Sequence, residues 1–97
     1  MSTTVPQSVA RQRVDCFSVF SAADPSVLPR IFEVFSLHGL VPSRCHSACL
    51  DSDDGQLVID IQVSELPSGL ADQLARRLRR VITVTEVLWS QKRRAGA

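Results

Sequence analysis

The sequence predicts an α+β domain in which two helices cover one face of a four-stranded antiparallel sheet. Three observations lead to this prediction. A strand pattern near the N-terminus runs directly into a helical pattern. Two further strand patterns follow, separated by a turn-forming segment. A second helical pattern and a final strand then complete a second strand–helix–strand order.

The first strand is expected over residues 14–21, where aromatic and β-branched residues dominate. A helix is expected over residues 25–38, because apolar residues recur at i, i+3, i+4 and i+7, the spacing of one buried helix face. These apolar positions are Leu28, Ile31, Phe32 and Phe35.

The residues at both ends of this predicted helix are types that commonly begin or end helices. Asp24 can cap the helix, and Pro25 has the backbone angle of a first helical turn. Gly39 stands where a left-handed residue would end the helix. Pro29 is tolerated only in a first turn, so it indicates that the regular helix begins late or that its start is distorted. The N-terminus of such a helix, with its exposed N–H groups, could hold a small anion.

The second half of the chain begins with a weak strand over residues 40–50. Residues 51–55 have the composition of a turn, and residues 57–63 alternate as a half-buried strand should. These two strands should form an antiparallel hairpin. A helix follows, with leucine recurring every four residues from Leu66 to Leu78, and a last strand is expected over residues 81–88.

This order of elements defines the ferredoxin-like βαββαβ sandwich. Right-handed crossovers place the first and third strands in the middle of the sheet and the other two at its edges. The weak strand over residues 40–50 is then an exposed edge. We expect it to pair with a second copy of the chain, which would give a homodimer with a continuous eight-stranded sheet.

Composition favours one small cytoplasmic domain. The 97 residues suffice for a single core, and the net charge of +1 does not favour nucleic acid or an anionic membrane as a partner. We divide the chain into a disordered arm over residues 1–11, the domain over residues 12–90 and a basic tail over residues 91–97. No membrane-spanning segment is expected. The three cysteines fit reduced thiols better than a disulfide framework.

Three segments carry a resemblance to the ACT domain family, and the resemblance as a whole covers nearly all of residues 14–88. They are residues 23–32 (ADPSVLPRIF), 38–43 (HGLVPS) and 74–87 (LARRLRRVITVTEV). The family consists of small-ligand regulatory modules attached to, or acting as subunits of, enzymes of amino-acid metabolism. A single domain of this length looks most like the short small regulatory subunit of acetohydroxyacid synthase (acetolactate synthase), an enzyme of branched-chain amino acid biosynthesis. The resemblance therefore implies a non-catalytic allosteric subunit whose partner is a larger enzyme.

The resemblance also implies an amino-acid effector held at a dimer interface. Two segments would line its site, one after the first strand and one entering the second strand. The family favours glycine where this chain has Ser26, and asparagine where it has Val41, so a side-chain amide that could bind the ligand is missing. A ligand-free dimerisation module is therefore the alternative. The implied ligand-binding residues are Asp24, Pro25, Ser26, Val27, Leu28, Gly39, Leu40, Val41 and Ser43.

Other functions have weaker support in the sequence. Cys45, His46 and Cys49 are zinc-ligand types, but an extended strand separates the two cysteines by about 13 Å and points His46 to the other face. We expect no metal or cofactor. Arginine clusters in the second helix and the tail could contact phosphates, yet the third strand has no aromatic residue for stacking bases, so we do not expect RNA binding. No nucleophile and base pair with suitable spacing is present, and we expect no catalytic residue. Trp89 is either an interface anchor or a cap on the core.

Overall fold

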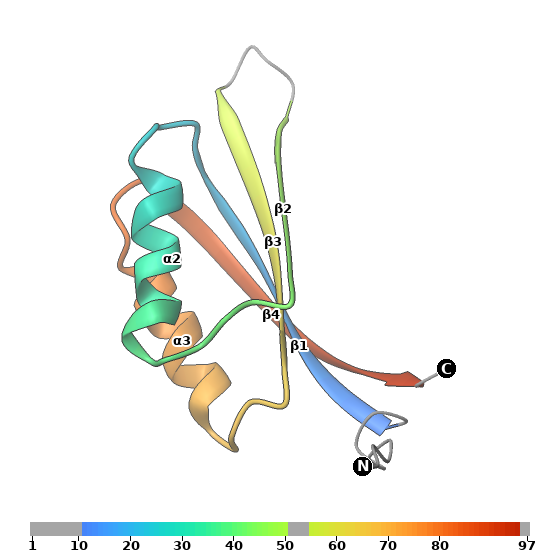
Figure 1. The fold of residues 1–97 in the computed structure, drawn as a ribbon. Coiled ribbons are helices and arrows are strands. Elements are labelled where there is room, and N and C mark those ends of the chain that lie inside the picture. Colours follow the sequence, from blue (N-terminus) through green and yellow to red (C-terminus); the bar gives the residue numbers. More distant parts are fainter. Residues whose placement is uncertain (1–10, 51–54, 96–97) are drawn as a thin grey trace, which may run out of the picture.

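The computed structural model describes residues 11–50 and 55–95, which form the predicted ferredoxin-like sandwich (Figure 1). The sheet has four antiparallel strands in the order β2-β3-β1-β4, so the predicted central and edge strands are confirmed. Both helices lie on one face of this sheet (Figure 1). The elements in chain order are β1 (Arg11–Ala22), α2 (Val27–Leu37), β2 (Arg44–Cys49), β3 (Gln56–Ser64), α3 (Leu70–Arg79) and β4 (Val84–Ala95).

The core lies between the helices and the sheet. Alternate residues of the central strands point towards the helices, as the two-residue period of a strand requires. The rings of Phe17 on β1 and Phe35 on α2 meet edge to face, with their centroids 5.9 Å apart. Such an aromatic pair contributes about 0.5–1.5 kcal/mol beyond its buried area. The other buried core residues include Val19, Val27, Ile31, Ile59, Ile61, Leu74, Leu78 and Val87.

The position at which α2 begins explains why Pro29 is tolerated. The helix begins at Val27, with Ser26 as its N-cap, rather than at residue 25 after an Asp24 cap. Pro29 therefore falls in the first turn, where its missing N–H has no intrahelical partner to lose. The prediction that the regular helix begins late is confirmed, and the prediction that Asp24 is the N-cap is wrong.

Other boundaries also differ from the prediction. β2 begins at Arg44 rather than at residue 40, because the chain first closes the end of α2 and passes through Pro42. α3 begins at Leu70 rather than at residue 66, although Leu66 is still buried in the core. β4 begins at Val84, so residues 81–83 belong to a connection. Phe32 was expected in the core but is 40% exposed on α2.

β4 is longer than predicted. It continues to Ala95, and its residues 91–95 pair with residues 11–15 of β1. A strand, and not a tail, therefore occupies residues 91–95, which corrects the predicted domain end at residue 90. The paired ends of β1 and β4 extend beyond the helical layer (Figure 1). Residues 1–10 of the predicted arm and residues 51–54 of the turn predicted over residues 51–55 lie outside the described residues.

Candidate functional site

The loop between β1 and α2 is held together by Asp24. The Oδ1 atom of Asp24 accepts hydrogen bonds from the backbone N–H of Ser26 at 2.8 Å and from the Ser26 hydroxyl at 2.7 Å. The backbone carbonyl of Asp24 also accepts from the N–H of Val27 at 3.1 Å. This is an Asx-type turn placed directly before the helix. The sequence places an aspartate here because its short side chain can satisfy backbone donors that a helix start leaves free.

These bonds keep Asp24 ionised. The side-chain hydrogen bond from Ser26 lowers the pKa of Asp24, and the Ser26 backbone bond and the charge of Arg30 lower it further. Burial opposes this effect but does not reverse it. The loop therefore presents a carboxylate at the N-terminal end of α2.

A small anion has little room at this helix start. The N–H of Ser26 already donates to Asp24, the N–H of Val27 donates to the Asp24 carbonyl, and Pro29 has no N–H. The N–H of Leu28 has no partner within the described part of the chain. The carboxylate of Asp24 would repel an added anion, so this end of the helix suits a ligand that carries a cationic group.

The second predicted segment closes the other end of α2. Gly39 has φ +68°, and its N–H donates to the carbonyl of Ser36 at 2.9 Å. The N–H of Leu40 donates to the carbonyl of Phe35 at 3.0 Å. These two bonds form a Schellman motif, which requires a left-handed residue at Gly39. The glycine thus ends the helix, as the sequence predicted.

Beyond this motif the chain turns towards the sheet. Val41 is 85% exposed, although it is a large apolar residue. Ser43 is tied to β3, since its N–H donates to the carbonyl of Gln62 at 2.8 Å. The entry to β2 is therefore fixed at Ser43, while Val41, two residues earlier, exposes an apolar side chain to solvent.

The predicted ligand-binding residues do not meet within one chain. Residues 24–28 lie at one end of α2 and residues 39–43 lie at the other end (Figure 1). The side chain of Val27 is fully buried in the core, so only its backbone could face a ligand. Leu28 and Leu40 pack against the core. A site that uses both segments needs a second copy of the chain.

β2 offers an edge for such a copy. The N–H of Leu50 donates to the carbonyl of Gln56 at 2.7 Å, which fixes the phase of the pairing with β3. Backbone groups alternate in direction along an antiparallel strand, so those of Ala48 face β3 while those of Ser47 face the open edge. Leu50, which follows the strand, is 38% exposed. The edge therefore combines free backbone groups with flanking apolar side chains.

A polar cluster that no sequence pattern indicated lies near the β1–α2 loop. The buried hydroxyl of Ser21 lies 2.8 Å from Thr83 Oγ1, and Thr83 has φ +83°, a strained value for a β-branched residue. The carbonyl of Thr83 accepts from the N–H of Ala22 at 3.2 Å. A hollow of about 280 Å³ beside this cluster is lined by Ser21, Ala22, Gly55, Gln56 and Thr85. No residue of this cluster was predicted as functional.

Trp89 has a defined partner at the other end of the sheet. Its Nε1–H donates to Oδ1 of Asp15 at 3.0 Å, and Asp15 is fully buried. Arg13 Nε lies 3.8 Å from the second carboxylate oxygen of Asp15, but neither of these two atoms has a hydrogen-bond partner in the described residues. The Arg13 guanidinium also donates to the carbonyl of Leu66. This cluster joins β1, β4 and the start of the β3–α3 connection.

The cysteines and histidine of β2 do not converge. Register puts Cys45 opposite Ile61 and His46 opposite Asp60, on opposite faces of the sheet. Within residues 11–50 and 55–95, no three metal-ligating side chains gather around one point. In the same residues, no helix is long and apolar enough to span a membrane.

The geometry defines a class of protein: a ferredoxin-like domain with an open edge strand beside two helix-end loops. The profile of the ACT-like domain family matches residues 6–96. The chain belongs to the ACT-like domain family. Its fold is thus of the type found in regulatory domains.

Solved structures agree with this family. The ACT domain of GTP pyrophosphokinase from Chlorobium tepidum superposes with a TM-score of 0.66 at 14% identity, covering 79% of this chain and 96% of that one. The C-terminal domain of the MgtC protein from Mycobacterium tuberculosis gives a TM-score of 0.66 at 14% identity, covering 97% and 99%. The regulatory subunit of aspartate kinase from Thermus flavus gives 0.58 at 10% identity, covering 81% of this chain and 51% of that subunit. At these identities the likeness is one of fold. No curated protein matches the chain by sequence.

Proposed function

We propose that this chain is a non-catalytic regulatory subunit that dimerises through β2 and binds an amino-acid effector between its two copies. The observation that supports this proposal is the position of the two predicted segments at opposite ends of α2, next to an open edge strand. Antiparallel pairing of two β2 strands reverses one chain relative to the other. Residues 39–43 of one copy would then approach residues 24–28 of its partner.

The charges around residue 24 suit an amino acid. The ionised carboxylate of Asp24 can attract the ammonium group of an amino acid. The exposed side chain of Val41, brought from the partner copy, supplies apolar contact. This combination favours an amino acid with an aliphatic side chain, such as valine, leucine or isoleucine.

The partner we propose is a larger cytoplasmic enzyme of amino-acid metabolism, such as acetohydroxyacid synthase. The family match and the fold shared with an aspartate kinase regulatory subunit support a regulatory role. An effector that binds one arrangement of the dimer more tightly would favour the state of the partner enzyme that goes with this arrangement. The coupling free energy between two such sites is typically about 1–3 kcal/mol. The chain itself needs no cofactor for this role.

Thermal unfolding of the purified chain with each free amino acid tests the effector. A ligand present at 100 times its dissociation constant should stabilise the folded state by about 2.7 kcal/mol. Asp24→Ala should abolish this shift, whereas Asp72→Ala, on the exposed surface of α3, should keep it. If no amino acid raises the melting temperature, the effector proposal is wrong.

A ligand-free dimerisation module is the second candidate. It is favoured by the internal bonds of Asp24 and the burial of Val27, which explain the loop without any ligand. Dimerisation without an amino-acid shift would support it. RNA binding has less support, because β3 carries no aromatic residue for stacking.

A further inference from the structure

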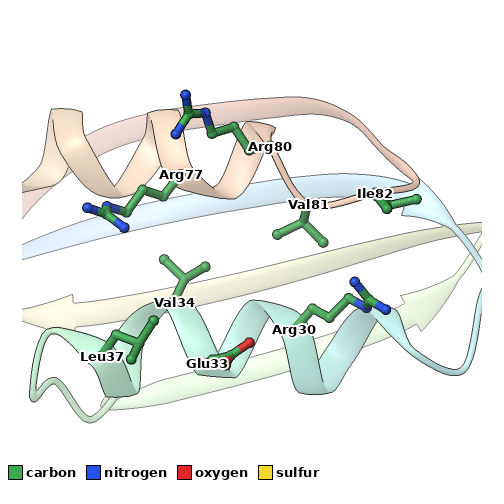
Figure 2. Close-up of a pocket in the computed structure, with 8 residues that line it drawn as sticks. All are labelled: Arg30, Glu33, Val34, Leu37, Arg77, Arg80, Val81 and Ile82. Carbon is green, nitrogen blue, oxygen red and sulfur yellow. The ribbon is translucent and has the colours of Figure 1, made fainter.

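The exposed side of the two helices carries a groove that the proposed regulatory role does not use. A hollow of about 340 Å³ lies between α2 and the end of α3 (Figure 2). Its apolar wall consists of Val34 and Leu37 on α2 with Val81 and Ile82 after α3. Leu37 is 70% exposed and Ile82 is 71% exposed. Large apolar side chains this exposed, gathered in one hollow, are typical of a contact surface.

The rim of this two-helix groove is basic. Arg30, Arg77 and Arg80 border it together with one carboxylate, that of Glu33 (Figure 2). A second hollow of about 380 Å³ lies on the other side of Arg77 and Arg80, beside Gln73. The two arginines therefore stand between two hollows along the exposed face of α3.

The arginines of α3 and its C-cap fall into two groups. Arg76 pairs with Asp72 one turn earlier, and an Nη2 atom of Arg79 donates to the carbonyl of Val87 at 3.4 Å. Arg77 and Arg80 have neither an ion pair nor a side-chain hydrogen bond within the described residues. Arg30 lowers the pKa of Asp24 by its charge but forms no ion pair there either. The guanidinium groups left without partners are thus the ones that border the groove.

We infer that the two-helix groove docks an acidic amphipathic segment of a partner protein. The apolar wall would take the apolar stripe of a helix, and the guanidinium groups would pair with flanking carboxylates. Nucleic acid fits less well, because no aromatic residue borders the groove to stack a base. The groove lies on the helical layer and not on the β2 edge, so this docking depends on neither the effector nor the dimer.

A synthetic helical peptide of about 14 residues, with leucine at i, i+3, i+4 and i+7 and glutamate on either side, is the probe. Its binding to ¹⁵N-labelled protein would be followed by NMR. We expect shifts that cluster on the exposed sides of α2 and α3 and in residues 81–82. A scrambled peptide of the same composition, which lacks the stripe, should bind about tenfold more weakly.

Paired variants separate specific docking from general charge attraction. Arg77→Gln with Arg80→Gln should weaken probe binding by about tenfold, and so should Ile82→Ser, which removes an exposed apolar contact without touching the core. Lys92→Gln with Arg93→Gln removes the same charge from exposed positions on β4 and should change binding little. The inference is overturned if the probe does not bind at millimolar concentration, if both double variants weaken it equally, or if an RNA oligonucleotide of equal charge binds as tightly.

Discussion

At the scale of single residues, Asp24 has the clearest chemical role. Its pKa is lowered in the folded state by the bonds from Ser26. A lowered folded-state pKa means that the ionised form stabilises the fold above the ordinary value of 3.8, and that this contribution is lost as the pH falls through the folded-state pKa. The loop that begins α2 should therefore weaken in acid.

Asp24→Asn tests this effect. At pH 7 the variant should be less stable than the wild type, and the gap should close as the pH is lowered below about 4. Urea unfolding at pH 7, 5 and 3 would measure it. Glu86→Gln, at an exposed carboxylate on β4, is the comparison variant. A gap that does not vary with pH would mean that the ionised carboxylate of Asp24 is not what stabilises the loop.

Trp89 was predicted either to anchor an interface or to cap the core, and the structure shows that its indole N–H donates to buried Asp15. Trp89→Phe keeps an aromatic ring but leaves the carboxylate without its hydrogen-bond donor. We expect a loss of about 2 kcal/mol in the free energy of unfolding, because the bond is made to a buried charged group. Leu88→Ala, at the exposed neighbouring position, should cost clearly less. If Trp89→Phe and Leu88→Ala lower the free energy of unfolding equally, the hydrogen bond from Trp89 to Asp15 does not stabilise the fold measurably.

At the scale of elements, β2 is the strand on which the proposed assembly depends. Ser47 directs its backbone groups to the open edge, whereas Ala48 directs its own to β3. Ser47→Pro should therefore block pairing with a second copy and leave the fold intact, since proline is tolerated on the free side of an edge strand. Ala48→Pro should break a bond to β3 and destabilise the domain.

Sedimentation of the two variants, together with their melting temperatures, checks this prediction. The expected result is a folded monomer for Ser47→Pro and a destabilised protein for Ala48→Pro. If the Ser47→Pro variant still dimerises, the dimer interface lies on another surface. The long edge of β4 would then be the first surface to test.

The sequence predicted the elements better than their ends, for reasons that particular residues make clear. Leu74 and Leu78 revealed α3 because helical spacing follows directly from burial on one face. The start of α2 was misplaced, because Asp24 can bond either a helix or a turn before it and only the structure separates the two. The strained backbone of Thr83 has no sequence signature, so the polar cluster beside the loop could not be predicted.

At the scale of the whole molecule, the largest correction concerns the last strand. Residues 91–97 look like a tail because they are polar and lack core side chains. Strand pairing needs only backbone groups, and β1 supplies them from residue 11 onwards. The candidate site was only partly predictable for a related reason. Its two segments are visible in the sequence, but within one chain they lie at opposite ends of α2, and the proposed site requires a second copy to bring them together.

A chain that ends at residue 90 tests this correction. It would lose the pairing of β4 with residues 11–15 and expose the buried Asp15 cluster. We expect a loss of at least about 1 kcal/mol, which lowers the melting temperature of a domain this size by about 4–8 °C. Removing residues 96–97 alone should change little. If the chain ending at residue 90 has the same melting temperature as the full chain, residues 91–95 do not stabilise the fold.

The pairing of Arg11 with Ala95 has a consequence for how this domain can be connected to others. The two ends of its described chain leave the sheet side by side, at about one strand spacing of 4.8 Å. A surface loop of another protein would need to open by only that distance to accept the whole unit. The domain is therefore suited to transplantation by insertion, and its ends could be joined by a short linker so that new termini are opened elsewhere.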